Sequence, residues 1–159
     1  MSKFPLLIIF SCFSFSLFGQ DQKNQSTLNL DSIAVVETIN GFIDAFTNLN
    51  WQKFTDYFSD SATAFFPPSA KFPSRANNKT EIEAVFKKVF DNARKQKSSP
   101  PFIVIEPKDL KIQIFDEVAI VTFVLNDPEL FGRRTIVLKE DNDKWLIVHL
   151  HASGVMIPG

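Results

Sequence analysis

The chain has 159 residues, of which 45% are hydrophobic and 22% charged, so it is long enough for one domain with a real core and too apolar for a disordered protein. A formal net charge of −1 does not fit the basic surface of nucleic-acid-binding proteins, and we expect no nucleic-acid partner. The chain has 18 phenylalanines but one tyrosine and two tryptophans, which predicts an interior, or an interior pocket, walled by aromatic rings.

The first residues have the layout of a secretory signal peptide. Lys3 supplies a positive charge, residues 4–18 are almost wholly apolar or small, and Gly19 precedes a polar run. The apolar stretch is too short to span a membrane. We therefore expect a signal peptide over residues 1–19, and a secreted or periplasmic chain without membrane contact after cleavage.

Cys12 is the single cysteine, and the residues before it weakly resemble a lipoprotein attachment box. The apolar run continues past Cys12, which favours cleavage after Gly19, with lipid attachment as the alternative. Cleavage leaves 159 − 19 = 140 residues and no cysteine. The mature chain would then have no disulfide, no catalytic thiol and no cysteine-ligated zinc.

The mature chain is expected to begin with a flexible polar leader over 20–30, followed by one domain over 31–159. From Asp31 onward, apolar residues recur at steps of three and four as far as Leu49, which predicts an amphipathic helix. A second, short helix is expected over 51–58, because its aromatic residues share one side.

A short strand is expected at 62–66, before a loop rich in proline, serine and asparagine. Thr80 and Glu83 then have the spacing of a capping box, in which each side chain bonds to a free backbone amide at the start of a helix. The helix that they open is expected to end at the basic turn 94–97, before two prolines.

The remaining sequence alternates with period two and predicts four strands, at 110–114, 118–125, 131–139 and 145–151. Short connections indicate an antiparallel meander. Helices followed by a sheet predict the α+β class, with N-terminal helices packed on a mainly antiparallel sheet. Several strands are apolar on both faces and no further helix remains, so we expect a homodimer in which a second copy covers the outer sheet face.

Two histidines, His149 and His151, lie two residues apart on the last expected strand. Period two places both on the face of Trp145 and Ile147. Such a pair could act as a general base or bind an anion, or could simply be half-buried and bonded to neighbours. No further histidine or cysteine completes a familiar ligand set, so we expect no metal site, and no cofactor is indicated.

Two adjacent arginines, Arg133 and Arg134, lie on the strand expected to pair with the histidine strand. A hairpin loop over 141–143 would place His151 opposite Arg133, and a loop over 142–143 would place it opposite Arg134. In both registers one guanidinium reaches the histidine face, where it would disfavour imidazole protonation and attract an anion.

Two further residues, Trp51 and Tyr57, each combine an apolar body with a polar tip. This suits a pocket and equally a core boundary. The sequence contains no serine-centred nucleophile elbow, glycine-rich phosphate loop or paired-carboxylate motif.

The last strand carries the motif of residues 145–154, which is similar to the W-x-x-V-H-x-H-x-S-G strand of calcium/calmodulin-dependent kinase association (hub) domains. With the order of elements and the segments 58–63, 118–123 and 133–138, the chain resembles the SnoaL-like group of the nuclear transport factor 2-like superfamily over residues 33–154. The resemblance implies a cone, in which helices pack on a strongly curved sheet that encloses a pocket, and a dimer through the outer sheet face.

The chain also differs from known members of this superfamily at positions that carry function in them. In the steroid isomerases of this superfamily, a base aspartate and a tyrosine occupy the positions of Phe66 and Phe42, so both proton-transfer groups are replaced by phenyl rings. In the hub branch, an arginine occupies the position of Ile136, whereas Arg134 lies two residues away on the same face.

Three functions remain open. The first is an exported domain that binds a small, largely apolar ligand with an anionic or carbonyl group in the cone pocket. The second is an enzyme of the isomerase, cyclase or hydrolase kind, with a histidine base in the same pocket, and the third is a non-catalytic dimerisation or interaction module. The candidate catalytic residues are His149 and His151, and the candidate ligand-binding residues are Arg134, His149, His151, Tyr57, Trp51, Phe42 and Phe66.

Overall fold

Helices and a six-stranded sheet form an α+β fold in the computed structural model, which describes residues 18–67, 69, 72–126 and 130–156. The helices are α1 (Phe18–Thr47), α2 (Trp51–Asp56) and α3 (Lys79–Gln96). The strands are β1 (Phe58–Phe65), β2 (Arg75–Ala76), β3 (Lys108–Phe115), β4 (Val118–Asn126), β5 (Leu130–Asp141) and β6 (Lys144–Met156).

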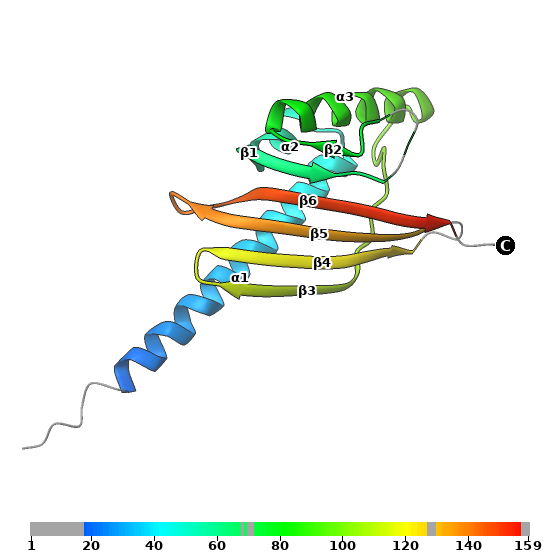
Figure 1. Cartoon of the computed structure of the whole chain (residues 1–159). Coiled ribbons are helices and arrows are strands. Elements are labelled where there is room, and N and C mark those ends of the chain that lie inside the picture. The colour runs from blue at the N-terminus through cyan, green and yellow to red at the C-terminus, as the bar shows by residue number, and fades with distance from the viewer. Residues whose placement is uncertain (1–17, 68, 70–71, 127–129, 157–159) are drawn as a thin grey trace, which may run out of the picture.

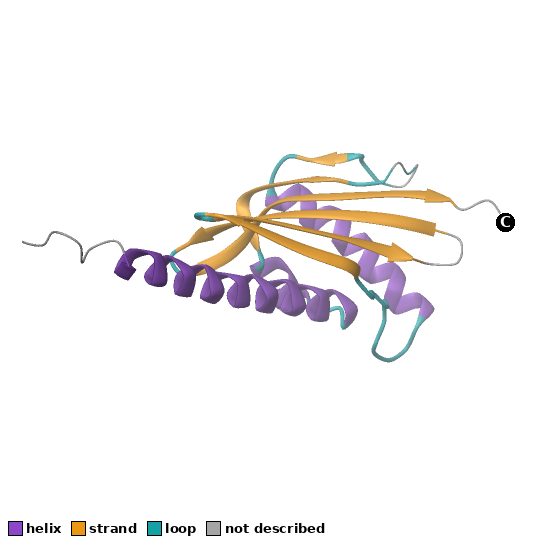
Figure 2. Cartoon of the chain, turned by 90° about the horizontal axis from the view of Figure 1, so that it is seen from below, coloured by secondary structure: helices purple, strands orange, loops and turns teal. Residues whose placement is uncertain are grey.

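The sheet has the order β2-β1-β6-β5-β4-β3, in which β1 and β6 are parallel and the other neighbours antiparallel. Figure 1 shows α1 crossing behind the strands and α3 lying beside β1 and β2. Figure 2 shows the curvature of the sheet around the helices. The expected α+β class and the meander of β3 to β6 are therefore confirmed.

The first helix is longer than expected. Residues 20–30, expected to be a flexible leader, form the early turns of α1. These residues include neither proline nor glycine, and a helix already nucleated by its buried half gains a hydrogen bond with each residue added. The expected signal peptide, as far as residue 17, and Cys12 lie outside the described residues. Among those described, no helix has both the length and the hydropathy of a membrane span.

The core between helices and sheet is strongly aromatic. Phe54 on α2 is fully buried, and its ring centroid lies 5.3 Å from Phe42, 5.3 Å from Phe58, 4.8 Å from Phe86 and 5.1 Å from Phe90. Aromatic pairs at such distances contribute beyond the area that they bury. The abundance of phenylalanine thus reflects a ring cluster that joins α1, α2, β1 and α3.

The start of α3 is capped two residues earlier than expected. The side chain of Asn78 accepts a hydrogen bond from the backbone amide of Glu81 at 2.9 Å, and the Glu81 carboxylate accepts one from the backbone amide of Asn77 at 2.8 Å. Hydrogen bonds to the carboxylate, first from the backbone amide of Asn77 and then from its side chain, hold the pKa of Glu81 below its ordinary value. The prediction of Thr80 and Glu83 as the capping pair is wrong, because asparagine caps at least as well as threonine and already has the extended backbone that a cap requires.

The hairpin between β5 and β6 has a two-residue turn. Asp141 pairs with Lys144, and the two residues between them, Asn142 and Asp143, have φ of 49° and 61°. Positive φ at both central positions is what the twist of a two-residue hairpin requires, and asparagine and aspartate tolerate it. This is the shorter of the two loops considered from the sequence.

A β-bulge in β6 then reverses which residues face inward. Ile147 pairs with Leu138, whereas His149 pairs with Val137, so Val148 is the extra residue. One inserted residue moves every later side chain to the opposite face. The expectation that His149 shares a face with Ile147 is therefore wrong, and Leu150 points inward instead.

The outer face of the sheet carries exposed apolar side chains. Phe65 on β1, Phe115 on β3 and Val155 on β6 are 43%, 56% and 62% exposed. Helices α1 and α3 pack on the inner face, where the buried residues of the sheet are found.

Candidate functional site

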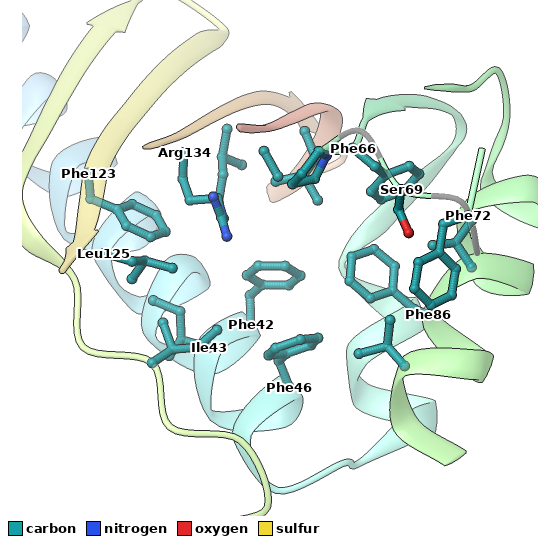
Figure 3. A pocket seen from close by; sticks show the side chains of 17 residues that line it. Phe42, Ile43, Phe46, Phe66, Ser69, Phe72, Phe86, Phe123, Leu125 and Arg134 are labelled. Atoms are coloured by element: carbon teal, nitrogen blue, oxygen red, sulfur yellow. The ribbon is translucent and has the colours of Figure 1, made fainter. Parts of the chain in front are cut away.

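A cavity of about 380 Å³ lies between the inner face of the sheet and the helices α1 and α3 (Figure 3). This volume is within the range of roughly 300–1,000 Å³ that is usual for small-molecule sites. The described lining residues are apolar apart from one arginine and one serine. The lining residues are Phe42, Ile43, Phe46, Phe66, Pro67, Ser69, Phe72, Val85, Phe86, Val89, Ile105, Phe123, Leu125, Arg134, Ile136, Leu150 and Ala152.

The lining follows from the periodicity of each element. On α1 and on α3, three residues at positions i, i+1 and i+4 form one stripe toward the pocket, because residues four apart lie one above the other on a helix. On β4, β5 and β6, alternate residues face the pocket. The helical residues are 42, 43 and 46 on α1 and 85, 86 and 89 on α3, and the strand residues are 123 and 125, 134 and 136, and 150 and 152.

Arg134 is the charged residue among the described residues that line the pocket. On β5 it pairs with Phe123 of β4 on one side and with Ala152 of β6 on the other. Its Nη1 atom donates to the backbone oxygens of Arg133 at 2.8 Å and Ser153 at 3.1 Å. Figure 3 shows the guanidinium directed toward the middle of the cavity, above Phe42.

The electrostatic setting of this guanidinium is unusual. Burial lowers the pKa of Arg134, although an arginine remains charged at neutral pH. The ion pairs of the described residues involve other cations, and the hydrogen bonds of Arg134 to this part of the chain are made through Nη1 alone. Within the described part of the chain, this partly desolvated cation has no carboxylate partner and keeps free donors at Nε and Nη2, an arrangement suited to hold an anion.

A glycine makes room for this arginine. A Cβ added at Gly132 would lie 3.3 Å from Nη1 of Arg134 and 3.5 Å from Cβ of Leu125. Gly132 lies two residues before Arg134 on the same strand and therefore on the same face. The absent side chain leaves space in which the guanidinium reaches the carbonyl oxygens.

Three of the residues expected to bind ligand, Arg134, Phe42 and Phe66, line the pocket. The last two are the positions at which the resemblance to steroid isomerases implies a tyrosine and an aspartate. Their phenyl rings form part of the apolar wall.

Two other candidates do not line the pocket. Trp51 packs against Phe90, with ring centroids 5.6 Å apart. Tyr57 packs against α1, where Gly41 makes room for its hydroxyl, since a Cβ at Gly41 would lie 2.0 Å from that oxygen. Burial, and then the negative charge of Asp44, raise the pKa of Tyr57. Both residues belong to the core boundary, which was the alternative reading of their amphipathic side chains.

The two histidines also lie outside the pocket, on the outer face of the sheet. Nδ1 of His149 is 2.8 Å from Oγ1 of Thr63, and the ring of Phe65 lies 5.5 Å from His149 and 6.0 Å from His151. Burial, followed by the charges of His151 and Arg75, lowers the pKa of His149. The expected placement of a histidine base in the pocket is therefore wrong.

The bulge also changes the partner of the second histidine. His151 pairs with Thr135, so neither Arg133 nor Arg134 lies opposite it. Among the described residues, no three histidine, cysteine, aspartate or glutamate side chains are grouped so as to hold a metal ion.

Several pocket residues were not singled out from the sequence. Phe123 and Leu125 alternate on β4, and Val85, Phe86 and Val89 belong to an apolar helix stripe, which is equally typical of core positions. The sequence did contain one further signal for the site, namely Gly132 two residues before Arg134. A glycine within a strand often marks a place where another group approaches the backbone closely.

Helices packed on one face of a curled, mixed sheet, with an apolar pocket between helices and sheet, define the class of cone-shaped α+β pocket domains. The model of the SnoaL-like domain family matches residues 35–158, and the chain belongs to this family. No curated protein matches the chain.

Solved structures of nuclear transport factor 2-like proteins share this fold. A protein of unknown function from Pseudomonas putida KT2440 has 16% identity and a TM-score of 0.62, and the match covers 75% of this chain and 82% of that one. A candidate dehydratase from Streptomyces avermitilis has 14% identity, a TM-score of 0.66 and coverages of 81% and 99%. A candidate calcium/calmodulin-dependent protein kinase II association domain from Xanthomonas campestris has 18% identity, a TM-score of 0.53 and coverages of 76% and 85%.

Proposed function

We propose that this domain binds a small, largely apolar molecule that carries one carboxylate, and that the carboxylate is held by Arg134. The observation that carries the proposal is the charged guanidinium inside a cavity whose other described lining side chains, apart from Ser69, are apolar. The apolar walls provide affinity through burial of the ligand body. The guanidinium provides orientation and selectivity for an anion.

Binding is favoured over proton-transfer catalysis by the residues on the pocket walls. General acid–base catalysis needs a titratable side chain within hydrogen-bond reach of the substrate. The described lining holds arginine and serine as its polar residues, while His149 and His151 are on the opposite face of the sheet. The dehydratase name of one similar structure belongs to that protein, since 14% identity supports a shared fold.

The proposal is tested by calorimetric titration with decanoate and decanol, which share a chain and differ in charge. Arg134→Met is expected to weaken decanoate binding by about 10- to 100-fold, since a hydrogen-bonded charge contributes roughly 1.5–3 kcal/mol. Decanol binding should stay unchanged. The exposed neighbour provides the matched control, because Arg133→Met removes the same charge outside the pocket. Equal losses of affinity for decanoate and decanol in Arg134→Met, or a wild-type protein that does not bind decanoate, would refute the proposal.

We also propose that the outer sheet face pairs with a second copy of the chain. Phe65, Phe115 and Val155 are exposed apolar side chains on this face. Pairing would remove them from water, and one similar structure is named for an association domain. Light scattering is expected to give twice the monomer mass, with a shift to monomer in Val155→Lys. A monomeric wild type would refute the pairing.

Export is proposed on the charge and hydropathy pattern of residues 1–19. N-terminal sequencing of the protein recovered from its host is expected to begin at Gln20. A retained Met1 or Ser2 would contradict export by cleavage.

A further inference from the structure

A second cavity adjoins the first. Its volume is about 240 Å³, and it opens beside the C-terminal half of α3. It shares two walls, Phe72 and Val89, with the pocket that holds Arg134. Its other lining residues are Asn92, Ala93, Gln96 and Ile103.

The two cavities lie next to one another along α3. The helix contributes Val85 and Val89 to the first cavity, and Val89, Ala93 and Gln96 to the second. Steps of three and four residues keep these side chains on one face of the helix. At about 1.5 Å per residue, the stretch from Val85 to Gln96 is roughly 16 Å long. The opposite wall continues in the same direction, with Ile105 in the first cavity and Ile103 in the second.

The charge lies at one end of this path. In Figure 3, Arg134 and Phe72 are on opposite sides of the first cavity, so a ligand with its carboxylate at Arg134 has its far end directed toward Phe72. From the other side of Phe72 the second cavity leads outward to Asn92 and Gln96, which are exposed. The order along this direction is therefore Arg134, the first cavity, the shared residues Phe72 and Val89, and the second cavity with its exposed residues.

We propose that the ligand is an unbranched long-chain carboxylic acid, whose tail passes between Phe72 and Val89 into the second cavity. The inference rests on the proposed function, because it takes the carboxylate to be at Arg134. A single file of methylene groups fits a passage between two apolar side chains, whereas a fused-ring ligand would be confined to the first cavity. The selectivity of the site is then for chain length.

Affinity across a series of acids tests this inference. Calorimetric titrations with hexanoate, decanoate and tetradecanoate are expected to show a gain of about three- to fourfold for each added methylene throughout the series, because each one is buried in turn. The second cavity is blocked by Asn92→Trp, at an exposed position on its wall. This variant should bind decanoate as the wild type does and lose the gain between decanoate and tetradecanoate.

The matched control is Ala84→Trp, which places the same ring at an exposed position of α3 that lines neither cavity. It should keep the full dependence on chain length, and circular dichroism should show both variants folded. An affinity that stops rising after decanoate in the wild type, with Arg134 still required, would overturn the tail path and leave the proposed function intact. Failure of every acid to bind would overturn both.

Discussion

The replacement Arg134→Met should separate the stability of the protein from its ligand binding. In the unliganded protein, the guanidinium is partly desolvated, and among the described residues it is compensated by two backbone oxygens and no carboxylate. Methionine is uncharged and flexible, and it replaces the apolar stem of the arginine without that desolvation cost. A gain of about 1 kcal/mol in the free energy of unfolding is expected, which is usual when a functional charge is removed from a binding site.

Urea denaturation without ligand measures this gain, and thermal melting should show a Tm higher by about 2–4 °C. The control Arg133→Met changes an exposed guanidinium and should move the Tm little. In the presence of decanoate the order of the Tm values of the wild type and Arg134→Met should reverse, because the ligand binds the wild type more tightly and stabilises it more. A substantial loss of stability in Arg134→Met would mean that the arginine is a structural residue, and would refute the reasoning.

Three further predictions concern the surrounding structure. Gly41→Ala should destabilise the protein by about 1–3 kcal/mol, because its Cβ would lie 2.0 Å from the Tyr57 hydroxyl oxygen. Tyr57→Phe removes that oxygen and should restore part of the loss in a double-mutant cycle measured by urea denaturation. Equal losses in the wild-type and Tyr57→Phe backgrounds would contradict the contact. Asn78→Ala should lower the free energy of unfolding by about 1 kcal/mol in urea denaturation, and Thr80→Ala should lower it much less. A larger loss in Thr80→Ala would show that Thr80 caps the helix, as expected from the sequence. Burial lowers the pKa of His149 from its ordinary value, so at mildly acidic pH the unfolded chain takes up a proton that the folded protein resists. The free energy of unfolding should therefore fall as the pH drops from neutral to about 5, and should fall less in His149→Gln, as measured by urea midpoints.

Much of the fold could be predicted because its elements have strong periodicity. The apolar steps after Asp31 and the alternation after residue 110 each bury one face of an element, and a pattern of that kind is local in the sequence. The cap of α3 was predicted at the wrong residue because Asn78 and Thr80 each lie three residues before a glutamate. The backbone conformation of the preceding loop decides which of the two caps the helix.

The site was predicted in part. Arg134 and the two phenylalanines Phe42 and Phe66 were placed correctly, whereas the histidines were placed on the wrong face. A period-two argument assumes an uninterrupted strand, and the single extra residue at Val148 breaks it. Residues 145–148 are all apolar, so no alternation of polar and apolar residues up to the bulge marked its position in advance.

The central claim is that a buried cation in this pocket receives the carboxylate of an apolar ligand. Decanoic acid labelled with ¹³C at its carboxyl carbon reports on this directly, since its chemical shift follows its ionisation during a pH titration of the complex. A carboxylate beside the Arg134 guanidinium should have a pKa below that of free decanoate, because the opposite charge favours the ionised form. A pKa above the free value would mean that the acid is buried among apolar walls alone, and would contradict the account.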